Sequence, residues 1–373
     1  MAARNPESVI NFAPGPAKIP AEVRKRVQDG IHSINGSGVG ILETSHRSSQ
    51  YTAINKETTD KLRTLLNVPA NYKILLMHGG GSGQFSAIPL NLVKGDNPTA
   101  DYFVTGTWSN KAAKEAEKYC KVNKVLPKMD SYTGVPHQSE WKLNPEASYV
   151  YYCENETVHG VEFHDVPDTG KVPLVCDMSS NFLSHEVDVS RYGLIYAGAQ
   201  KNVGCAGVTI VIVREDLIGH ADSKCPIILD YKQMADMDSV YNTPCTVAVY
   251  VLGLVLDWII AQGGIKAMNK NSAAKSSMLY NVIDQSNGFY YCPVKDKFRS
   301  RMNVTFRVGG VEGDKKLEEK FIEEASLRGM LSLKGHRSVG GMRASLYNAI
   351  TTEEAKQLQT FMLEFMKSNV HEQ

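Results

Sequence analysis

A single lysine, Lys201, lies between small residues in the segment 197–207, AGAQKNVGCAG, just before the apolar run VTIVIV. Lysines on solvated helix faces usually have polar neighbours. Small neighbours, by contrast, leave space for a group that is not a side chain to approach the lysine closely. An accessible amine of this kind can form a Schiff base with a carbonyl compound. A turn lysine before a buried strand would give the same pattern, so this segment alone leaves both interpretations open.

A glycine-rich turn, HGGGSGQ, follows the apolar run YKILLM and precedes a helix start. Free backbone amides and the positive end of a helix dipole can bind a phosphate group there. The turn is not a P-loop, because no Gly-Lys-Ser/Thr follows, and it is a poor dinucleotide fingerprint, because the glycine pattern ends on Ser86. A purely structural turn is the alternative.

Three more residues follow strand-like runs. Trp108 comes after TGT, Thr157 lies in CENETVHGVEF, and Asp177 ends the apolar run VPLVCD. Core packing of the tryptophan and helix capping by the aspartate are the structural alternatives. Together with the glycine turn and Lys201, however, they supply what pyridoxal 5'-phosphate needs: amides for its phosphate, a stacking face, a carboxylate for its ring nitrogen and an amine for its aldehyde. We therefore predict a site for this cofactor at the strand ends.

Composition limits the function classes. The chain has 373 residues with a formal net charge of +1, so no overall field would attract nucleic acid or an acidic membrane. Its seven cysteines are scattered without a CxxC pair, which favours reduced thiols over disulfides or a zinc site. The N-terminus lacks the apolar core of a signal peptide, and the apolar run VAVYVLGLVL is too short to span a bilayer. We expect a cytoplasmic protein with no metal, membrane or nucleic-acid partner.

Seven apolar or β-branched runs alternate with helix-like segments between residues 72 and 213. This alternation predicts an α/β fold whose large domain has a mainly parallel seven-stranded sheet flanked by helices. After residue 264 the pattern changes to that of a smaller α+β domain. We expect a large domain at 17–264 and a small C-terminal domain at 265–373, with the N-terminal segment 1–16 associated with the latter.

The chain resembles the phosphoserine aminotransferase family, in the class V branch of fold-type I pyridoxal phosphate enzymes. The resemblance runs essentially end to end. It rests on the motifs NFAPGPAKIP, SHRSS, GGGSGQFSA, SYVYYCENETVHGVEF, CDMSSNFLS, AGAQKNVG, YNTP and LSLKGHRSVGGMRASLYNA. Departures from the family pattern at Ala13, Cys205 and Cys245 involve no expected contact residue.

The resemblance implies roles for the cofactor residues. Lys201 would bind the cofactor covalently, Asp177 would pair with its ring nitrogen, and Trp108 would stack on the ring. Thr157 would contact the phenolic oxygen. The phosphate would be held by Gly81, Ser82 and Gln200, and by Asn242 and Thr243 from a second subunit. The family's homodimer, with active sites at the subunit interface, is therefore expected.

Five cationic groups form the expected substrate site: His46 and Arg47 in SHRSS, and His336, Arg337 and Arg343 in GHRSVGGMR. Guanidinium groups bind phosphate and carboxylate in bidentate fashion, although a lone His-Arg pair is more often solvated surface. In the family, the first four contact the substrate phosphate and Arg343 the α-carboxylate. The implied reaction is reversible transamination of O-phospho-L-serine and 2-oxoglutarate to 3-phosphooxypyruvate and L-glutamate, in L-serine biosynthesis.

Two other kinds of protein share part of this pattern. Alanine–glyoxylate transamination or cysteine desulfuration would share the cofactor residues, but neither needs five cationic groups. A desulfurase also needs a mobile catalytic cysteine loop, which is not evident in the sequence. A non-catalytic cofactor binder or scaffold would tend to have lost part of the Lys201, Asp177 and arginine set. Use of phosphohydroxythreonine as a further substrate stays open.

Overall fold

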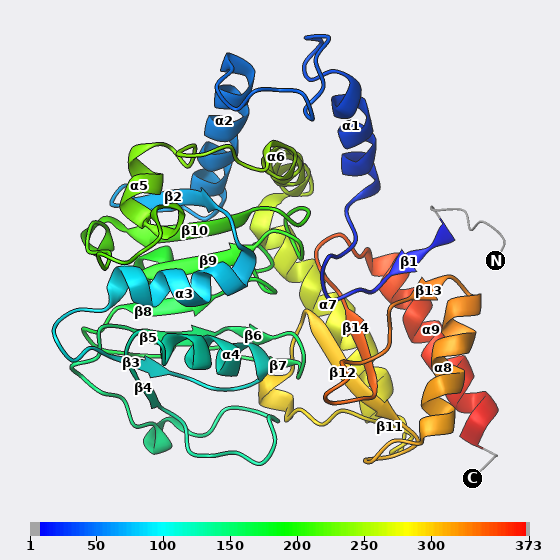
Figure 1. Ribbon diagram of the computed structural model, residues 1–373. Coiled ribbons are helices and arrows are strands. Elements are labelled where there is room, and N and C mark those ends of the chain that lie inside the picture. Colours follow the sequence, from blue (N-terminus) through cyan, green and yellow to red (C-terminus); the bar gives the residue numbers. More distant parts are fainter. Residues whose placement is uncertain (1–7, 371–373) are drawn as a thin grey trace.

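The computed structural model describes residues 8–370, and its centre is a seven-stranded sheet. The strands run in the order β2 (Tyr72–Met77), β10 (Thr209–Arg214), β9 (Leu194–Gly198), β8 (Leu174–Asp177), β5 (Val150–Cys153), β3 (Thr99–Tyr102) and β4 (Lys121–Lys124). Only β10 is antiparallel to its neighbours within this sheet. The predicted α/β class and the mainly parallel seven-stranded sheet are confirmed (Figure 1).

Helices cover both faces of the sheet because its strands are apolar on both faces. In β10, Val211 and Val213 pack into one core while Ile210 and Ile212 pack into the other. The first core is closed by α3 (Gly80–Leu92), α4 (Thr107–Ala116) and α5 (Tyr231–Asp236). The second is closed by α2 (Ser49–Leu65) and α6 (Thr246–Ala261), while α7 (Gly264–Asp284) packs mainly against the C-terminal unit.

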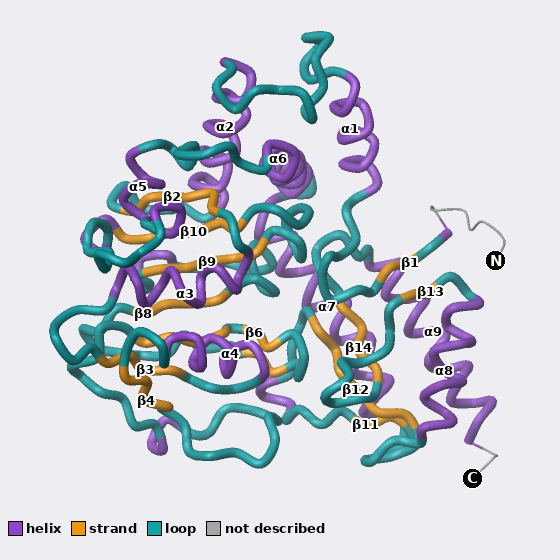
Figure 2. The backbone as a smooth tube through the Cα atoms, in the orientation of Figure 1, coloured by secondary structure: helices purple, strands orange, loops and turns teal. Residues whose placement is uncertain are grey.

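The C-terminal part of the chain forms a smaller unit beside the sheet (Figure 2). Its three-stranded sheet has the order β11 (Tyr290–Tyr291), β12 (Asn303–Val308) and β14 (Met342–Ser345). The helices α8 (Lys315–Leu327) and α9 (Thr352–Asn369) complete it. The strand β1 (Ile10–Asn11) pairs in parallel with β13 (Met330–Leu331). The domain bounds stay a prediction, and residues 1–7 of the expected N-terminal segment lie outside the described residues.

The remaining elements are short or peripheral. They are the helix α1 (Ala21–His32), the strand pair β6 (Asn155–Glu156) and β7 (Val161–Glu162), and the 3-10 turns η2 (Gln138–Glu140), η3 (Val189–Arg191), η4 (Glu215–Leu217), η5 (Ile227–Leu229) and η6 (Asp296–Phe298). Within residues 8–370, no single helix has both the length and the apolar composition of a membrane span; α6 and α7 reach them only as a pair, which is bent by 82°. All seven cysteines are free.

One buried ammonium group connects α7 to the loop after β14. Lys275 Nζ donates hydrogen bonds to the carbonyl oxygens of Leu346, Tyr347 and Ile350 at 2.9, 2.9 and 2.7 Å. Removal of the amine would leave these acceptors without their donor in a site where water does not replace it easily.

We therefore expect Lys275→Met to lower the free energy of unfolding by about 3 kcal/mol, measured by urea denaturation. The matched control is Lys266→Met, which changes an exposed lysine of the same helix and should alter stability by less than about 0.5 kcal/mol. Equal stability of the two variants would contradict the structural role of the buried amine.

Candidate active site

A cavity of about 200 Å³ lies at the carboxyl ends of the parallel strands. These ends meet at one edge of the sheet, so the loops that follow β2, β3, β5, β8 and β9 converge there. The cavity is lined by Gly80, Gly81, Ser82, Phe85, Trp108, Cys153, Asn155, Thr157, Asp177, Ser179, Ser180, Gln200 and Lys201. Seven expected cofactor residues, Gly81, Ser82, Trp108, Thr157, Asp177, Gln200 and Lys201, are thus brought together.

The amine of Lys201 points across this cavity. Its Nζ donates a hydrogen bond to Thr157 Oγ1 at 2.7 Å and lies 6.0 Å from the ring centroid of Trp108. Gly15 approaches this side chain closely from another segment, since a Cβ on Gly15, whose φ is +126°, would lie 3.1 Å from Lys201 Cγ. The side chain is therefore held in one direction but remains accessible from the cavity.

The carboxylate of Asp177 is buried, with 7% of the residue exposed. Its Oδ1 accepts from the Ser179 backbone N–H at 2.9 Å, and its Oδ2 accepts from Tyr196 Oη at 2.8 Å. Tyr196 Oη also lies 2.8 Å from Tyr151 Oη. Burial, followed by the charge of Asp177, raises the pKa of both tyrosines well above 10, so they stay protonated as donors. Each carboxylate oxygen can still accept another hydrogen bond.

The glycine turn supplies another part of the cavity wall. Gly79, with φ of +88°, is the N-cap of α3, and the cavity wall includes Gly80, Gly81 and Ser82 from the first turn of this helix. Backbone N–H groups in a first helical turn have no partner within the helix and point out from its end. The turn therefore has the geometry of an anion site, and its binding of a phosphate stays a prediction.

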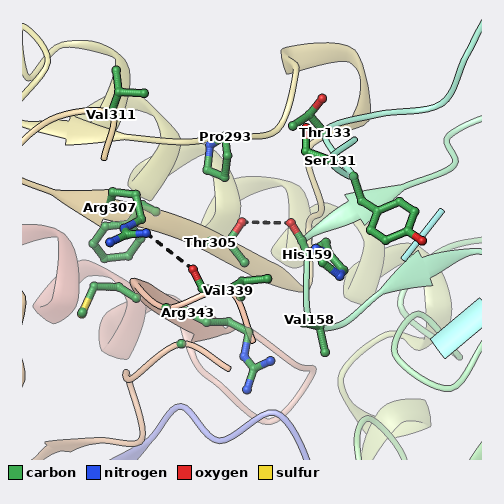
Figure 3. A pocket seen from close by; sticks show the side chains of 15 residues that line it. Ser131, Thr133, Val158, His159, Pro293, Thr305, Arg307, Val311, Val339 and Arg343 are labelled. Atoms are coloured by element: carbon green, nitrogen blue, oxygen red, sulfur yellow. Dashed lines mark hydrogen bonds between the residues drawn. The ribbon is translucent and has the colours of Figure 1, made fainter. Parts of the chain in front are cut away.

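Of the expected substrate residues, Arg343 contacts a residue of the cavity wall, and His336 and Arg337 lie on the loop before it. Arg343 is 6% exposed, and its Nη1 donates to the carbonyl of Thr157 at 3.2 Å. Burial lowers the pKa of this guanidinium. Burial, followed by the charges of Arg343, Arg337 and Lys111, lowers the pKa of His336. Arg337 itself is exposed on the same loop. Arg343 also lines a neighbouring cavity of about 260 Å³ between the sheet loops and β12 (Figure 3).

The other four expected residues lie elsewhere within this chain. His46 is half-buried and lines a different cavity, beside α2, while Arg47 is exposed. Asn242 is half-buried, its Oδ1 has no hydrogen-bond partner among the described residues, and Thr243 is exposed. The two segments that carry these four residues lie side by side, because Thr246 Oγ1 donates to the Ile41 carbonyl at 3.4 Å.

Some polar groups at the site were not predicted from the sequence. Glu156 accepts from the backbone N–H groups of Trp108 and Ser109 at 3.0 and 2.8 Å, and so fixes the start of α4. Tyr196 and His159 were also missed. For Glu156 and His159 the sequence offered one indication, the segment CENETVHGVEF, in which polar residues directly follow an apolar strand.

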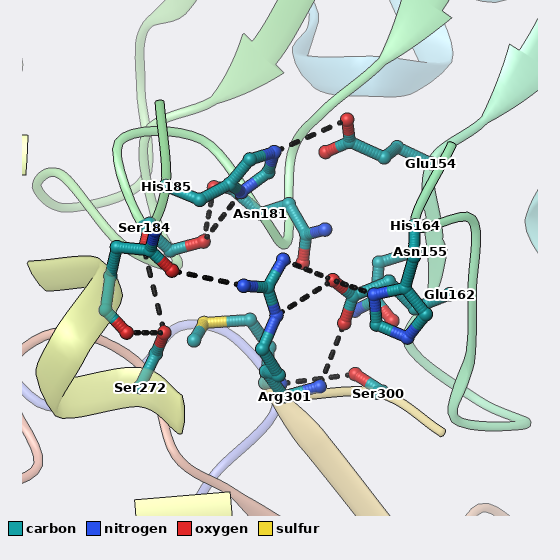
Figure 4. Close-up of polar contacts among 12 residues, drawn as sticks. Glu154, Asn155, Glu162, His164, Asn181, Ser184, His185, Ser272, Ser300 and Arg301 are labelled. Atoms are coloured by element: carbon teal, nitrogen blue, oxygen red, sulfur yellow. Dashed lines mark hydrogen bonds and ion pairs between the residues drawn. The ribbon is translucent and has the colours of Figure 1, made fainter. Parts of the chain in front are cut away.

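A buried polar cluster joins this region to the C-terminal unit (Figure 4). Arg301 Nη2 pairs with Glu162 Oε1 at 2.9 Å. Asn155, which lines the active-site cavity, donates from Nδ2 to Asn303 Oδ1 at 2.8 Å and to Ser180 Oγ at 2.9 Å. The strand loops and β12 are thus held in a fixed relation on one side of the cavity.

The chain matches the family described as aminotransferase class-V over residues 9–358. It belongs to the class-V aminotransferases. Among these, it is 59% identical over 362 residues to a phosphoserine aminotransferase from Drosophila melanogaster, covering 97% of this chain and 99% of the relative. It is 50% identical over 361 residues to a phosphoserine aminotransferase from Pseudomonas putida, covering 96% and 98%.

Solved structures of class-V aminotransferases agree with the fold described above. A phosphoserine aminotransferase from Bacillus circulans subsp. alkalophilus has a TM-score of 0.93 at 41% identity and covers 97% of this chain and 99% of its own. A phosphoserine aminotransferase with bound PLP from Trichomonas vaginalis has a TM-score of 0.91 at 40% identity, covering 95% and 99%.

Proposed function

We propose that the chain is a phosphoserine aminotransferase of L-serine biosynthesis, which reversibly converts O-phospho-L-serine and 2-oxoglutarate to 3-phosphooxypyruvate and L-glutamate. The observation that carries this proposal is one cavity in which Lys201, Asp177 and Trp108 meet beside the buried guanidinium of Arg343. The full-length similarity to phosphoserine aminotransferases supports it.

The cavity residues fit pyridoxal 5'-phosphate. Trp108 offers a ring face, Asp177 a buried carboxylate, Lys201 an amine, and the first turn of α3 backbone donors for the phosphate. Asp177 has capacity for a further hydrogen bond, and Trp108 Nε1 and Arg343 Nε are buried without a partner among residues 8–370. When bound, this cofactor supplies a carbonyl for the substrate amine and a ring that accepts electrons from the substrate Cα.

The protein's own groups position the substrate and move its proton. Lys201 Nζ, directed by Thr157 Oγ1, would take the proton from Cα of the amino acid in one half-reaction and deliver a proton to Cα of the second substrate in the return half-reaction. Asp177 keeps a negative charge at the ring-nitrogen end, and the protonated Tyr196 holds that carboxylate in place. Because both substrates react in turn in one site, the kinetics are expected to be ping-pong.

Cationic side chains explain how one pocket accepts two substrates. Arg343 would bind the α-carboxylate common to both amino acids, since its position against Thr157 places it near Lys201. His336 and Arg337 would bind the distal anion, which is a phosphate in phosphoserine and a carboxylate in glutamate. An apolar pocket could bind neither group well.

We infer that the enzyme is a homodimer in which His46, Arg47, Asn242 and Thr243 complete the site of the other subunit. These residues share one region of the surface, away from the lining of their own cavity. Exposed apolar side chains lie in the same two segments, among them Leu42 and Tyr241, at 64% and 39% exposure. A contact between subunits would cover such side chains.

An absorbance titration of the purified protein tests the proposed function. The visible band of the bound cofactor should fade with O-phospho-L-serine but not with L-alanine, and it should return with 2-oxoglutarate. A band that fades with alanine would move the activity elsewhere in class V. The absence of any band after addition of pyridoxal phosphate would refute the cofactor assignment.

We expect Arg337→Ala to lower kcat/KM for O-phospho-L-serine by at least about tenfold, because a charge-assisted phosphate contact is worth about 1.5–3 kcal/mol. Affinity for the cofactor, measured by fluorescence titration, should change little. Lys334→Ala is the matched control, since it removes one exposed positive charge from the same loop. Equal losses of turnover and cofactor affinity would contradict the role of Arg337.

A further inference from the structure

The segment 156–160 contacts the start of α4, Lys201 and Arg343. Glu156 holds the amides at the start of α4, and a Cβ on Gly106 would lie only 2.4 Å from Glu156 Cδ, so the two segments are in direct contact. Thr157 binds both Lys201 and Arg343. The next polar side chain along the segment, His159, has no role in the proton transfer or substrate binding described above.

His159 joins three elements. Its Nε2 lies 3.0 Å from Thr107 Oγ1, in the first turn of α4 and next to Trp108. Its ring packs edge-on against Tyr132, with centroids 5.0 Å apart. Its carbonyl accepts from Thr305 Oγ1 in β12 at 3.1 Å. Figure 3 shows His159 and Arg343 as walls of the same cavity. His159 therefore connects α4, through its imidazole, to β12, through its backbone carbonyl, on the side of the site where the substrate anions are expected.

The imidazole of His159 is uncharged at neutral pH. Burial, followed by His336 in its protonated form, lowers the pKa of His159 to about 4. The charges of Arg343, Arg337 and Lys111 act on His336. The charge of Glu156 acts on Tyr132, whose ring packs against that of His159. The neutral ring can therefore form a directional hydrogen bond. It carries no positive charge that would attract the anionic groups of the substrate away from the neighbouring cations.

We propose that His159 is a positioning residue: through its hydrogen bond with Thr107 it orients the first turn of α4, and with it the stacking ring of Trp108. This assignment rests on the proposed transaminase function. Glu156 accepts from the backbone N–H of Trp108, while His159 binds the hydroxyl group of Thr107 in the same turn. The tryptophan is therefore held from two directions. Loss of the bond loosens the ring without removing any group that contacts substrate.

A double-mutant cycle between His159 and Thr107 tests the proposal. It is made in full-length Trp141→Phe/Trp258→Phe protein, where Trp108 is the only tryptophan left of three. His159→Leu and Thr107→Val each remove the hydrogen bond, whereas His159→Asn and Thr107→Ser keep a group able to make it. Both single losses should lower kcat about fivefold to tenfold, as one hydrogen bond predicts, with KM for O-phospho-L-serine nearly unchanged.

Non-additivity is the expected signature. The double variant should be no slower than the slower single variant, because both changes remove the same bond. The fluorescence anisotropy of Trp108 should fall in His159→Leu and Thr107→Val, and recover in His159→Asn and Thr107→Ser. Additive losses of kcat, or unchanged anisotropy, would overturn the proposal.

Failure of the proposed function is distinguishable from failure of this inference. If the parent protein does not transaminate phosphoserine, the anisotropy of Trp108 still reports whether His159 orients it. If His159→Leu does not fold, Thr107→Val, which removes only the partner hydroxyl, provides the same comparison against Thr107→Ser.

Discussion

Replacement of Lys201 by alanine should abolish steady-state transamination, with a loss of turnover of at least about 10⁴-fold. Two contributions disappear together, because in the proposed function the lysine is both the covalent attachment point of the cofactor and the group that moves the Cα proton. Proton transfer by a positioned side chain alone contributes about 10²–10⁴-fold. No other amine donates to Thr157 Oγ1 among the described residues, so no neighbour can take over both roles.

Lys111 is the natural control, because its Nζ lies 4.6 Å from the ring centroid of Trp108, closer than that of Lys201. Lys111 lies on the exposed side of α4, whereas Lys201 extends from the end of β9. Borohydride reduction followed by peptide mass spectrometry should therefore find the cofactor on Lys201 and not on Lys111. A Lys201→Ala enzyme with appreciable turnover, or cofactor attached to Lys111, would refute the assignment.

The convergence of the expected cofactor residues of one subunit on a single cavity could be predicted, because each is close in sequence to a strand end. Glycine, tryptophan, threonine, aspartate and lysine follow five apolar runs, and parallel strands bring such positions to one edge. Hydrophobic pattern and chain order were therefore sufficient to place Lys201 and Asp177 in one cavity. The mainly parallel sheet followed from the same alternation of strands and helices.

The groups that orient these residues were not predictable in this way. Tyr196 lies in the middle of an apolar strand, so its sequence context indicates only core packing. Glu156 and His159 act on α4 across a gap of about fifty residues in sequence, and nothing in the local pattern indicates the partner. Their roles depend on tertiary contacts. The burial of Arg343 likewise depends on how the C-terminal unit packs against Thr157.

The second large effect is expected for Asp177→Asn, which should lower kcat about 10²–10³-fold, as loss of a preorganised electrostatic group does. Asparagine has nearly the same shape and can still accept from the Ser179 backbone N–H, so the fold should be retained. It has no negative charge, however, and cannot keep a proton on the ring nitrogen. Absorbance and single-turnover kinetics with O-phospho-L-serine measure the loss.

Tyr196→Phe separates the charge of the carboxylate from its orientation. This change removes the hydroxyl that donates to Asp177 Oδ2 but leaves the charge and the Ser179 contact. One lost hydrogen bond should lower kcat by only about tenfold. If Tyr196→Phe were as slow as Asp177→Asn, the position of the carboxylate rather than its charge would control the reaction. If Asp177→Asn were as fast as the unmodified enzyme, Asp177 would be no more than a strand-end cap.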